Sequence, residues 1–131
     1  NMEAMIMIQT VCENIGATGC ALLSFLYAIG VDPILAIADY DDLVKNGLIA
    51  TDCTIQDYVK LAKYFNVDCS LMYSSNTLAY IKDKMYLGRW TRNGYNHFVV
   101  MKNGKVFWNP LDVSKCVNEG TLSDIRVIKA I

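Results

Sequence analysis

Histidine is nearly absent from this sequence, since His97 is the only one in 131 residues. A catalytic zinc site with two or three histidine ligands is therefore excluded. The five cysteines are odd in number and none are spaced as CxxC, so neither a cysteine-pair zinc site nor a complete disulfide framework is indicated. We expect reduced thiols, a cytoplasmic protein and no metal or other cofactor, with secretion and membership of a longer protein left open.

Clustered charge and long apolar runs are also missing. Twelve Lys and Arg side chains are scattered among thirteen Asp and Glu, with no basic run that follows a phosphate backbone, so nucleic acid is not an expected partner. The longest apolar stretch, residues 21–29, is far shorter than the roughly 20 residues that cross a bilayer. We therefore expect no insertion into a membrane.

The composition that remains is that of a folded domain. Hydrophobic residues make up 53% of the chain and charged residues 19%. A chain of this length buries a sufficient core without metals or disulfides. Residues 1–131 are therefore expected to form a single domain.

Helical patterns fill the first half. Residues 20–29 are apolar on every side, which is typical of a helix buried at the centre of a domain, and Gly30 is expected to end it. A second helix is predicted from Pro33 to residue 44, and a third is predicted to begin with Thr54 as its N-cap.

Strand patterns fill the second half, after a change to alternating polarity at residues 67–73. A short helix is expected at residues 76–82. Further strands are predicted at residues 85–91, 97–101, 105–108 and 125–131. Helices followed by antiparallel strands predict an α+β domain in which the N-terminal helices pack on a C-terminal sheet.

Cys20 is the candidate nucleophile. It stands at the start of the buried helix, where unpaired amides and the helix dipole stabilise a thiolate. Cys12 is a rival, but no helix pattern begins there and the adjacent Glu13 would raise its pKa. We therefore rank Cys12 below Cys20.

His97 is the candidate base, and Asn109 or Asp112 is the candidate group that orients its ring. A two-residue turn at Asn103-Gly104 would place Asn109 opposite Phe98, and so on the face away from His97. One bulged residue or a three-residue loop removes this conflict. The sequence alone therefore leaves both Asn109 and Asp112 as candidates for the orienting group.

The intermediate of acyl transfer needs hydrogen-bond donors for its oxyanion. The amide of Cys20 supplies one donor, and the side chain of Gln9 is the upstream candidate for a second. The aromatic residues Trp90, Tyr95 and Trp108 flank the predicted site strands, where they would line a substrate groove or belong to the core.

Taken together, these residues resemble the papain-like cysteine peptidases, and among them most closely the bacteriocin-processing double-glycine peptidases of bacteria and their phage relatives. The shared pattern here consists of Gln9, Gly19-Cys20, Ser24, Gly30, His97-Phe98-Val99-Val100, Asn103-Gly104 and Asn109-Pro110. Two features differ from the family pattern: Ala21-Leu22 replaces the usual Gly or Gly-Pro, and the spacing from Gln9 to Cys20 is longer.

The resemblance implies a papain-like fold and hydrolysis of a peptide or amide bond through a thioester. Cys20 would be the nucleophile, His97 the base, Asn109 the orienting residue and Gln9 part of the oxyanion hole. The expected partner is a peptide or protein substrate. An inactive domain that binds a peptide or protein, and a deamidase or acyltransferase using the same residues, are the alternatives.

Overall fold

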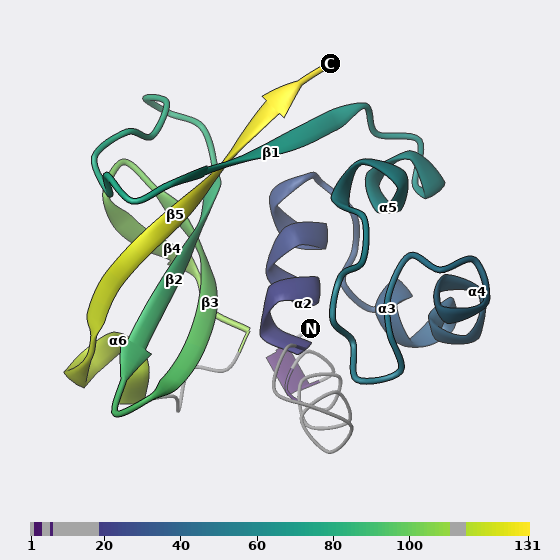
Figure 1. Ribbon diagram of the computed structural model, residues 1–131, viewed down its shortest axis with the longest axis horizontal. Helices are drawn as coiled ribbons and strands as arrows, with labels where there is room; N and C mark the ends of the chain where they lie inside the picture. Colours follow the sequence, from purple (N-terminus) through teal and green to yellow (C-terminus); the bar gives the residue numbers. More distant parts are fainter. Residues whose placement is uncertain (1, 4–5, 7–18, 111–114) are drawn as a thin grey trace.

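The computed structural model describes residues 2–3, 6, 19–110 and 115–131. It is an α+β structure, as expected, with helices in the first half and an antiparallel sheet in the second (Figure 1). The helices are α2 (Gly19–Ala28), α3 (Leu35–Ala38), α4 (Tyr40–Lys45), α5 (Tyr58–Tyr64) and α6 (Lys115–Glu119). The strands are β1 (Cys69–Ser74), β2 (Tyr86–Arg92), β3 (Tyr95–Lys102), β4 (Lys105–Trp108) and β5 (Thr121–Ala130).

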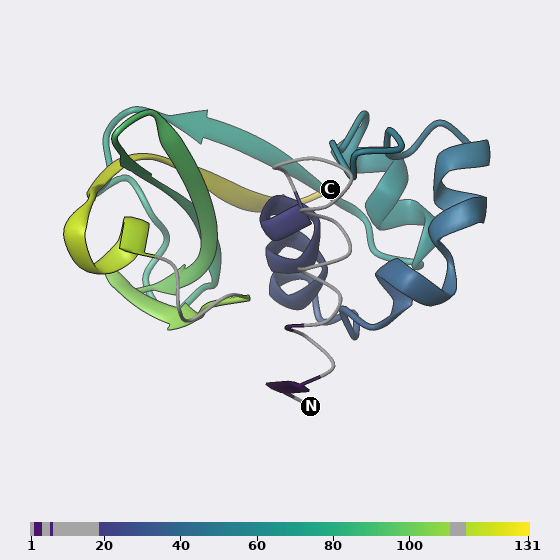
Figure 2. The same cartoon turned by 90° about the horizontal axis from the view of Figure 1, so that it is seen from below.

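The strands form one sheet in the order β1-β5-β2-β3-β4, and each neighbouring pair is antiparallel. Helix α2 lies between this sheet and the group α3 to α5, both in Figure 1 and in the perpendicular view of Figure 2. In the described part of the chain, no helix has the length and apolar character needed to span a membrane.

Helix α2 is the central element, and its sequence explains why. Leu22, Leu23, Phe25 and Leu26 are fully buried, as an all-round apolar helix requires. The helix ends at Gly30, whose φ of 83° is the left-handed conformation that glycine adopts without strain. The amide of Val31 donates to the carbonyl of Leu26 and that of Gly30 to Tyr27, which is the Schellman pattern. The predicted helix and its stop are confirmed.

The other predicted helices needed correction. The expected helix after Pro33 is divided into α3 and α4 at Asp39, which has φ −108° and ψ 11°. The predicted cap Thr54 is wrong, because the Asp57 side chain accepts the Lys60 amide at 3.0 Å and so caps α5. The helix expected at residues 76–82 is also wrong, since this segment contains turns and irregular backbone. Helix α6 was not expected.

The sheet separates two hydrophobic cores. Phe98 and Val100 of β3 pack in the core that contains α2, whereas Val99 and Met101 pack in a smaller core on the other face. This division follows from the alternation of side chains along a strand. His97 shares the second face by the same alternation.

Candidate active site

Cys20 lies in the first turn of α2, with only 3% of its surface exposed. Its sulfur accepts a hydrogen bond from the backbone amide of Phe98 at 3.4 Å. The β3–β4 ladder stops at the pair Val100–Trp108, so the Phe98 amide meets the sulfur where a further strand partner would otherwise lie. The thiol is therefore held against β3 at the residue that follows His97.

Ser24 makes a second link between the same two elements. Its hydroxyl donates to the carbonyl of Phe98 at 3.2 Å, and its side chain is fully buried. The backbone amide and carbonyl of Phe98 thus bind two side chains one helical turn apart on α2. This pair of hydrogen bonds sets the position of Cys20 along β3.

Two features of the Cys20 site stabilise a thiolate, whereas burial of the sulfur opposes the charge. An amide donor stabilises the charged sulfur more than the neutral thiol, and the start of a helix adds a favourable dipole. The other described cysteines, Cys53, Cys69 and Cys116, are buried, and no disulfide joins any two of the described ones. Burial, together with the nearby Asp68, raises the pKa of Cys69. Cys69 therefore provides a contrasting thiol in the same molecule.

His97 is 4% exposed, and its Nε2 lies 2.7 Å from Oδ1 of Asn109. Because a carbonyl oxygen only accepts, Nε2 carries the proton and donates to Asn109. In this tautomer Nδ1 is the basic nitrogen of the neutral ring. The hydrogen bond therefore gives Asn109 the geometry of an orienting residue.

A bulge in β4 brings Asn109 to the face of His97. The turn has two residues, Asn103 and Gly104, with φ of 52° and 79°, as a type I′ hairpin requires. Met101 pairs with Val106 but Val100 pairs with Trp108, which leaves Phe107 as an extra residue. Continuing this register puts Asn109 opposite Val99, which shares the face of His97. The bulge, and not a longer loop, resolves the conflict predicted from the sequence.

Three residues considered above lie outside the described residues. These are Gln9, the candidate oxyanion donor, Cys12, the rival nucleophile, and Asp112, the alternative orienting group. Within the described ranges, no cluster of three His, Cys, Asp or Glu side chains has the arrangement of a metal site.

The three flanking aromatic residues have different surroundings. Trp90 pairs with His97 across β2 and β3, so the two side chains share a face, and its indole N–H is buried with no acceptor among the described residues. Trp108 stacks on Tyr27 at a centroid distance of 4.4 Å and lines a cavity of about 620 Å³ near the end of α2 remote from Cys20. Tyr95 is 73% exposed. Of the three, Trp90 is the one beside His97.

Sequence reasoning missed a group of polar residues on the α2-facing side of the sheet. Asp124 is 4% exposed and forms ion pairs with Arg89 and Arg126. Burial by itself raises the pKa of Asp124, but the hydrogen bonds and charges of the two arginines outweigh it and hold that pKa below its usual value. The sequence signal was the presence of charged residues at alternating positions, 124 and 126, next to the apolar residues Ile125, Val127 and Ile128 of the same strand.

Comparison with known proteins gives one match. The chain matches no curated protein and no solved structure. A family model matches residues 6–130, which include every described residue of the site. The chain therefore belongs to that family, which is described as "Protein of unknown function, DUF261".

Proposed function

We propose that this protein is a papain-like cysteine hydrolase that cleaves a peptide or amide bond through a thioester. The observation that carries the proposal is the 2.7 Å hydrogen bond between His97 and Asn109. The next residue of β3, Phe98, binds the sulfur of Cys20 through its backbone amide. A nucleophile, a base and an orienting group drawn from α2, β3 and the end of β4 are what covalent catalysis by cysteine requires.

In the proposed first step, Nδ1 of His97 takes the proton of the Cys20 thiol. The sulfur then attacks the carbonyl carbon, so that an S–C bond forms and an electron pair moves to oxygen. The Cys20 amide, with the Gln9 side chain, would donate to this oxyanion. As the intermediate collapses, the C–N bond breaks and His97 returns the proton to the leaving amine.

Water completes the reaction. His97 removes a proton from water, whose oxygen attacks the thioester carbonyl, and the carboxylic acid leaves as the thiol is restored. The proposal includes a peptide or protein as substrate, a papain-like fold, a single domain over residues 1–131 and a cytoplasmic location. The central helix packed on an antiparallel sheet supports the fold.

One observation favours a second candidate, an inactive domain of the same fold that binds a peptide or protein. Cys20 is only 3% exposed, and Ala21, at the position where the peptidases that this chain resembles usually have glycine, is 6% exposed. A deamidase or acyltransferase would use the same residues and would differ only in the acceptor that attacks the thioester.

Alkylation by iodoacetamide across a pH series, read by mass spectrometry at each cysteine, separates these candidates. If the thiol is activated, the alkylation rate of Cys20 will stay at its plateau down to pH values well below 8.5, which is about the pKa of an ordinary thiol. Near pH 6.5, Cys20 will then react about 100-fold faster than an unactivated thiol. Cys69, which is 4% exposed against 3% for Cys20, is the matched internal control for access.

The variant His97→Ala should remove the plateau and leave the Cys69 rate unchanged. The variant Cys20→Ala should lack the fast alkylation, which confirms that this reaction is correctly assigned to Cys20. If Cys20 reacts no faster than Cys69 and the His97 variant changes nothing, hydrolysis is excluded and the binding domain is the better explanation.

A further inference from the structure

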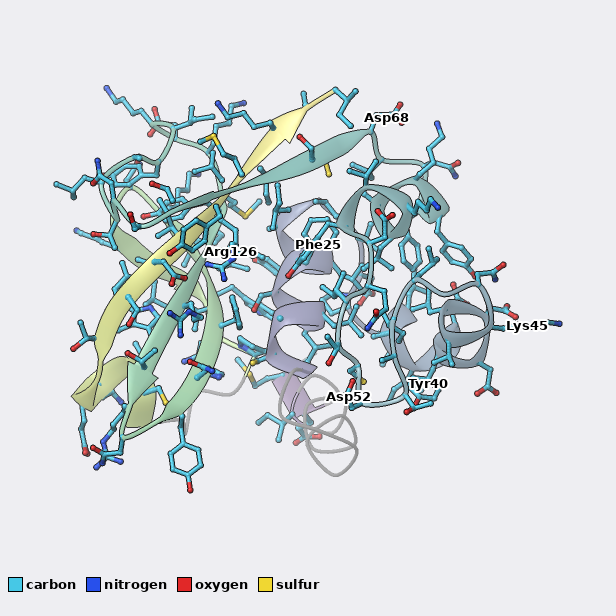
Figure 3. All side chains as sticks on the ribbon, in the orientation of Figure 1. Phe25, Tyr40, Lys45, Asp52, Asp68 and Arg126 are labelled. Atoms are coloured by element: carbon cyan, nitrogen blue, oxygen red, sulfur yellow. The ribbon has the colours of Figure 1, made fainter. Side chains whose placement is uncertain are left out.

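Three charged side chains, Arg89, Asp124 and Arg126, form a group on the sheet, and the role assigned to it here rests on the proposed function. Arg126 pairs with Leu87 across β5 and β2, and Leu87 belongs to the core that contains α2. Directly paired residues share a face of a sheet. Arg126 therefore projects toward α2, and Figure 3 shows it on that side of the sheet.

One carboxylate in this group serves two guanidinium groups. Arg89 reaches both oxygens of Asp124, at distances of 2.6 to 3.1 Å, and also donates to Asn96 at 2.7 Å. Arg126 donates to Asp124 through one nitrogen, Nη1. The three side chains together carry one excess positive charge.

Arg126 retains donors for a further anion. Asp124 is its one hydrogen-bond acceptor within the described residues, whereas a guanidinium has five N–H groups. Its side chain is 22% exposed, while that of Asp124 is 5% exposed. The excess charge is therefore located on the arginine that has unused donors and access to solvent.

Two aromatic rings hold the guanidinium of Arg126 in place. Its Cζ lies 4.9 Å from the ring centre of Tyr73 and 5.5 Å from that of Phe98, both within the range of cation–π attraction. Phe98 is the residue whose amide binds the Cys20 sulfur. A single residue thus contacts both the candidate nucleophile and the cation.

The charges of Arg126 and Cys20 both act on the Tyr58 hydroxyl. Burial raises the pKa of that hydroxyl, the positive charge of Arg126 lowers it and a negative charge on Cys20 raises it.

We propose that Arg126 is a specificity-determining residue that binds a carboxylate of the substrate next to the bond attacked by Cys20. The substrate class is then an amide or peptide with an acidic side chain or a free carboxylate close to the scissile bond. Arginine suits this role because its planar fork binds carboxylates with two parallel hydrogen bonds.

Two alkylating probes test this without knowledge of the substrate. Iodoacetate carries a carboxylate and iodoacetamide a neutral amide, and with either probe the sulfur forms a bond to carbon as iodide leaves. The measured quantity is the ratio of the iodoacetate rate to the iodoacetamide rate at Cys20. We expect Arg126→Gln to lower this ratio about tenfold, the effect of losing a charge-assisted hydrogen bond.

Two further variants make the result specific. Arg92→Gln removes a positive charge elsewhere on the sheet, where it pairs with Glu119 at 2.8 Å, and should leave the ratio unchanged. Arg126→Lys keeps the charge without the fork and should give an intermediate ratio. Since Asp124 keeps its contacts with Arg89, we expect Arg126→Gln to remain folded, which its circular dichroism checks.

The outcomes distinguish the two proposals. An activated Cys20 whose ratio is the same in Arg126→Gln and the starting protein overturns the carboxylate subsite and leaves the hydrolase intact. An equal fall in Arg92→Gln also overturns the subsite, because a general field would then explain the preference. A Cys20 that is not activated in the starting protein rejects the hydrolase and this inference together.

Discussion

At the scale of single residues, the proposed mechanism depends on how Asn109 orients His97. The hydrogen bond to Nε2 selects one tautomer and holds the ring in one plane, so that Nδ1 is the basic nitrogen. Trp90 lies opposite His97 on the neighbouring strand β2, where it limits the movement of the imidazole ring. The orienting residue is thus expected to act through His97 and not by contact with substrate.

The variant Asn109→Ala tests this role. We expect the rate of Cys20 alkylation near pH 6.5 to fall about tenfold, because loss of one buried hydrogen bond frees the imidazole to turn. Mass spectrometry at each cysteine measures the rate. Asn46→Ala is the control, since the Asn46 amide donates to an exposed carbonyl of α4, that of Asp42. Equal rates in the two variants would remove Asn109 from the mechanism.

At the scale of elements, the bulge in β4 determines which face Asn109 occupies. Phe107 is the residue that the ladder does not pair. Removing it should give a regular hairpin in which Trp108 still pairs with Val100 and Asn109 still reaches His97. The deletion of Phe107 is therefore expected to keep Cys20 activated.

Inserting one glycine between Phe107 and Trp108 should have the opposite effect if Phe107 stays bulged, because the glycine then takes the place of Trp108 opposite Val100. Asn109 would then move opposite Phe98, on the face away from His97, and the alkylation rate should fall to the level of Asn109→Ala. The same pH series measures both variants. Loss of activation in the deletion together with its retention in the insertion would disprove this account of register.

Gly30 determines where α2 ends. With a φ of 83° and no heavy atom within 4 Å of an added Cβ, the position penalises other residues through the backbone alone. We expect Gly30→Ala to lower the free energy of unfolding by about 1 kcal/mol. Gly30→Asn should cost less because asparagine tolerates the left-handed region. Urea denaturation measures both, and an alanine variant as stable as the starting protein would contradict this reasoning.

The elements also show what the sequence could predict. Periodicity identified α2 and the paired strands because burial on one or all sides requires a regular spacing of apolar residues. It could not locate the bulge at Phe107, since an unpaired residue leaves no periodic signal. The sequence did not distinguish Thr54 from Asp57 as the cap, because both side chains can accept a hydrogen bond from a backbone amide. Only the geometry of the chain decides between them.

The site was predictable to a similar degree. His97 was chosen as the only histidine of the chain, Cys20 because it stands at the start of an apolar helix, and Asn109 because Asn109-Pro110 follows the hairpin as in the papain-like pattern. The position of Arg126 could not be predicted from the sequence, because strand pairing and not sequence proximity brings it to Phe98 and Tyr73.

At the scale of the whole molecule, Asp124 links the stability of the sheet to pH. Its folded-state pKa is depressed by Arg89 and Arg126, so its stabilising effect is complete above the unfolded-state value of about 3.9. This stabilisation is lost as the pH falls through the lower, folded-state pKa.

The variant Asp124→Asn should therefore be less stable than the starting protein at pH 7, by about 3 kcal/mol, since two partly buried arginines lose their counter-ion. The difference should shrink below about pH 4 as the native carboxyl protonates. Urea denaturation at a series of pH values measures it. A difference that stays constant down to pH 2 would show that the ion pairs do not cause it.

The distances along the chain between the site residues have a consequence for how the protein is made. His97 and Asn109 are 12 residues apart and lie within the local meander of β2 to β4, whereas Cys20 and Phe98 are 78 residues apart. Local pairings form faster than distant ones. During synthesis the cysteine leaves the ribosome first. If Cys20 is activated as proposed, it remains an ordinary thiol until the meander has formed and α2 has docked on it, and the nascent chain carries no activated nucleophile that could attack its neighbours before folding is complete.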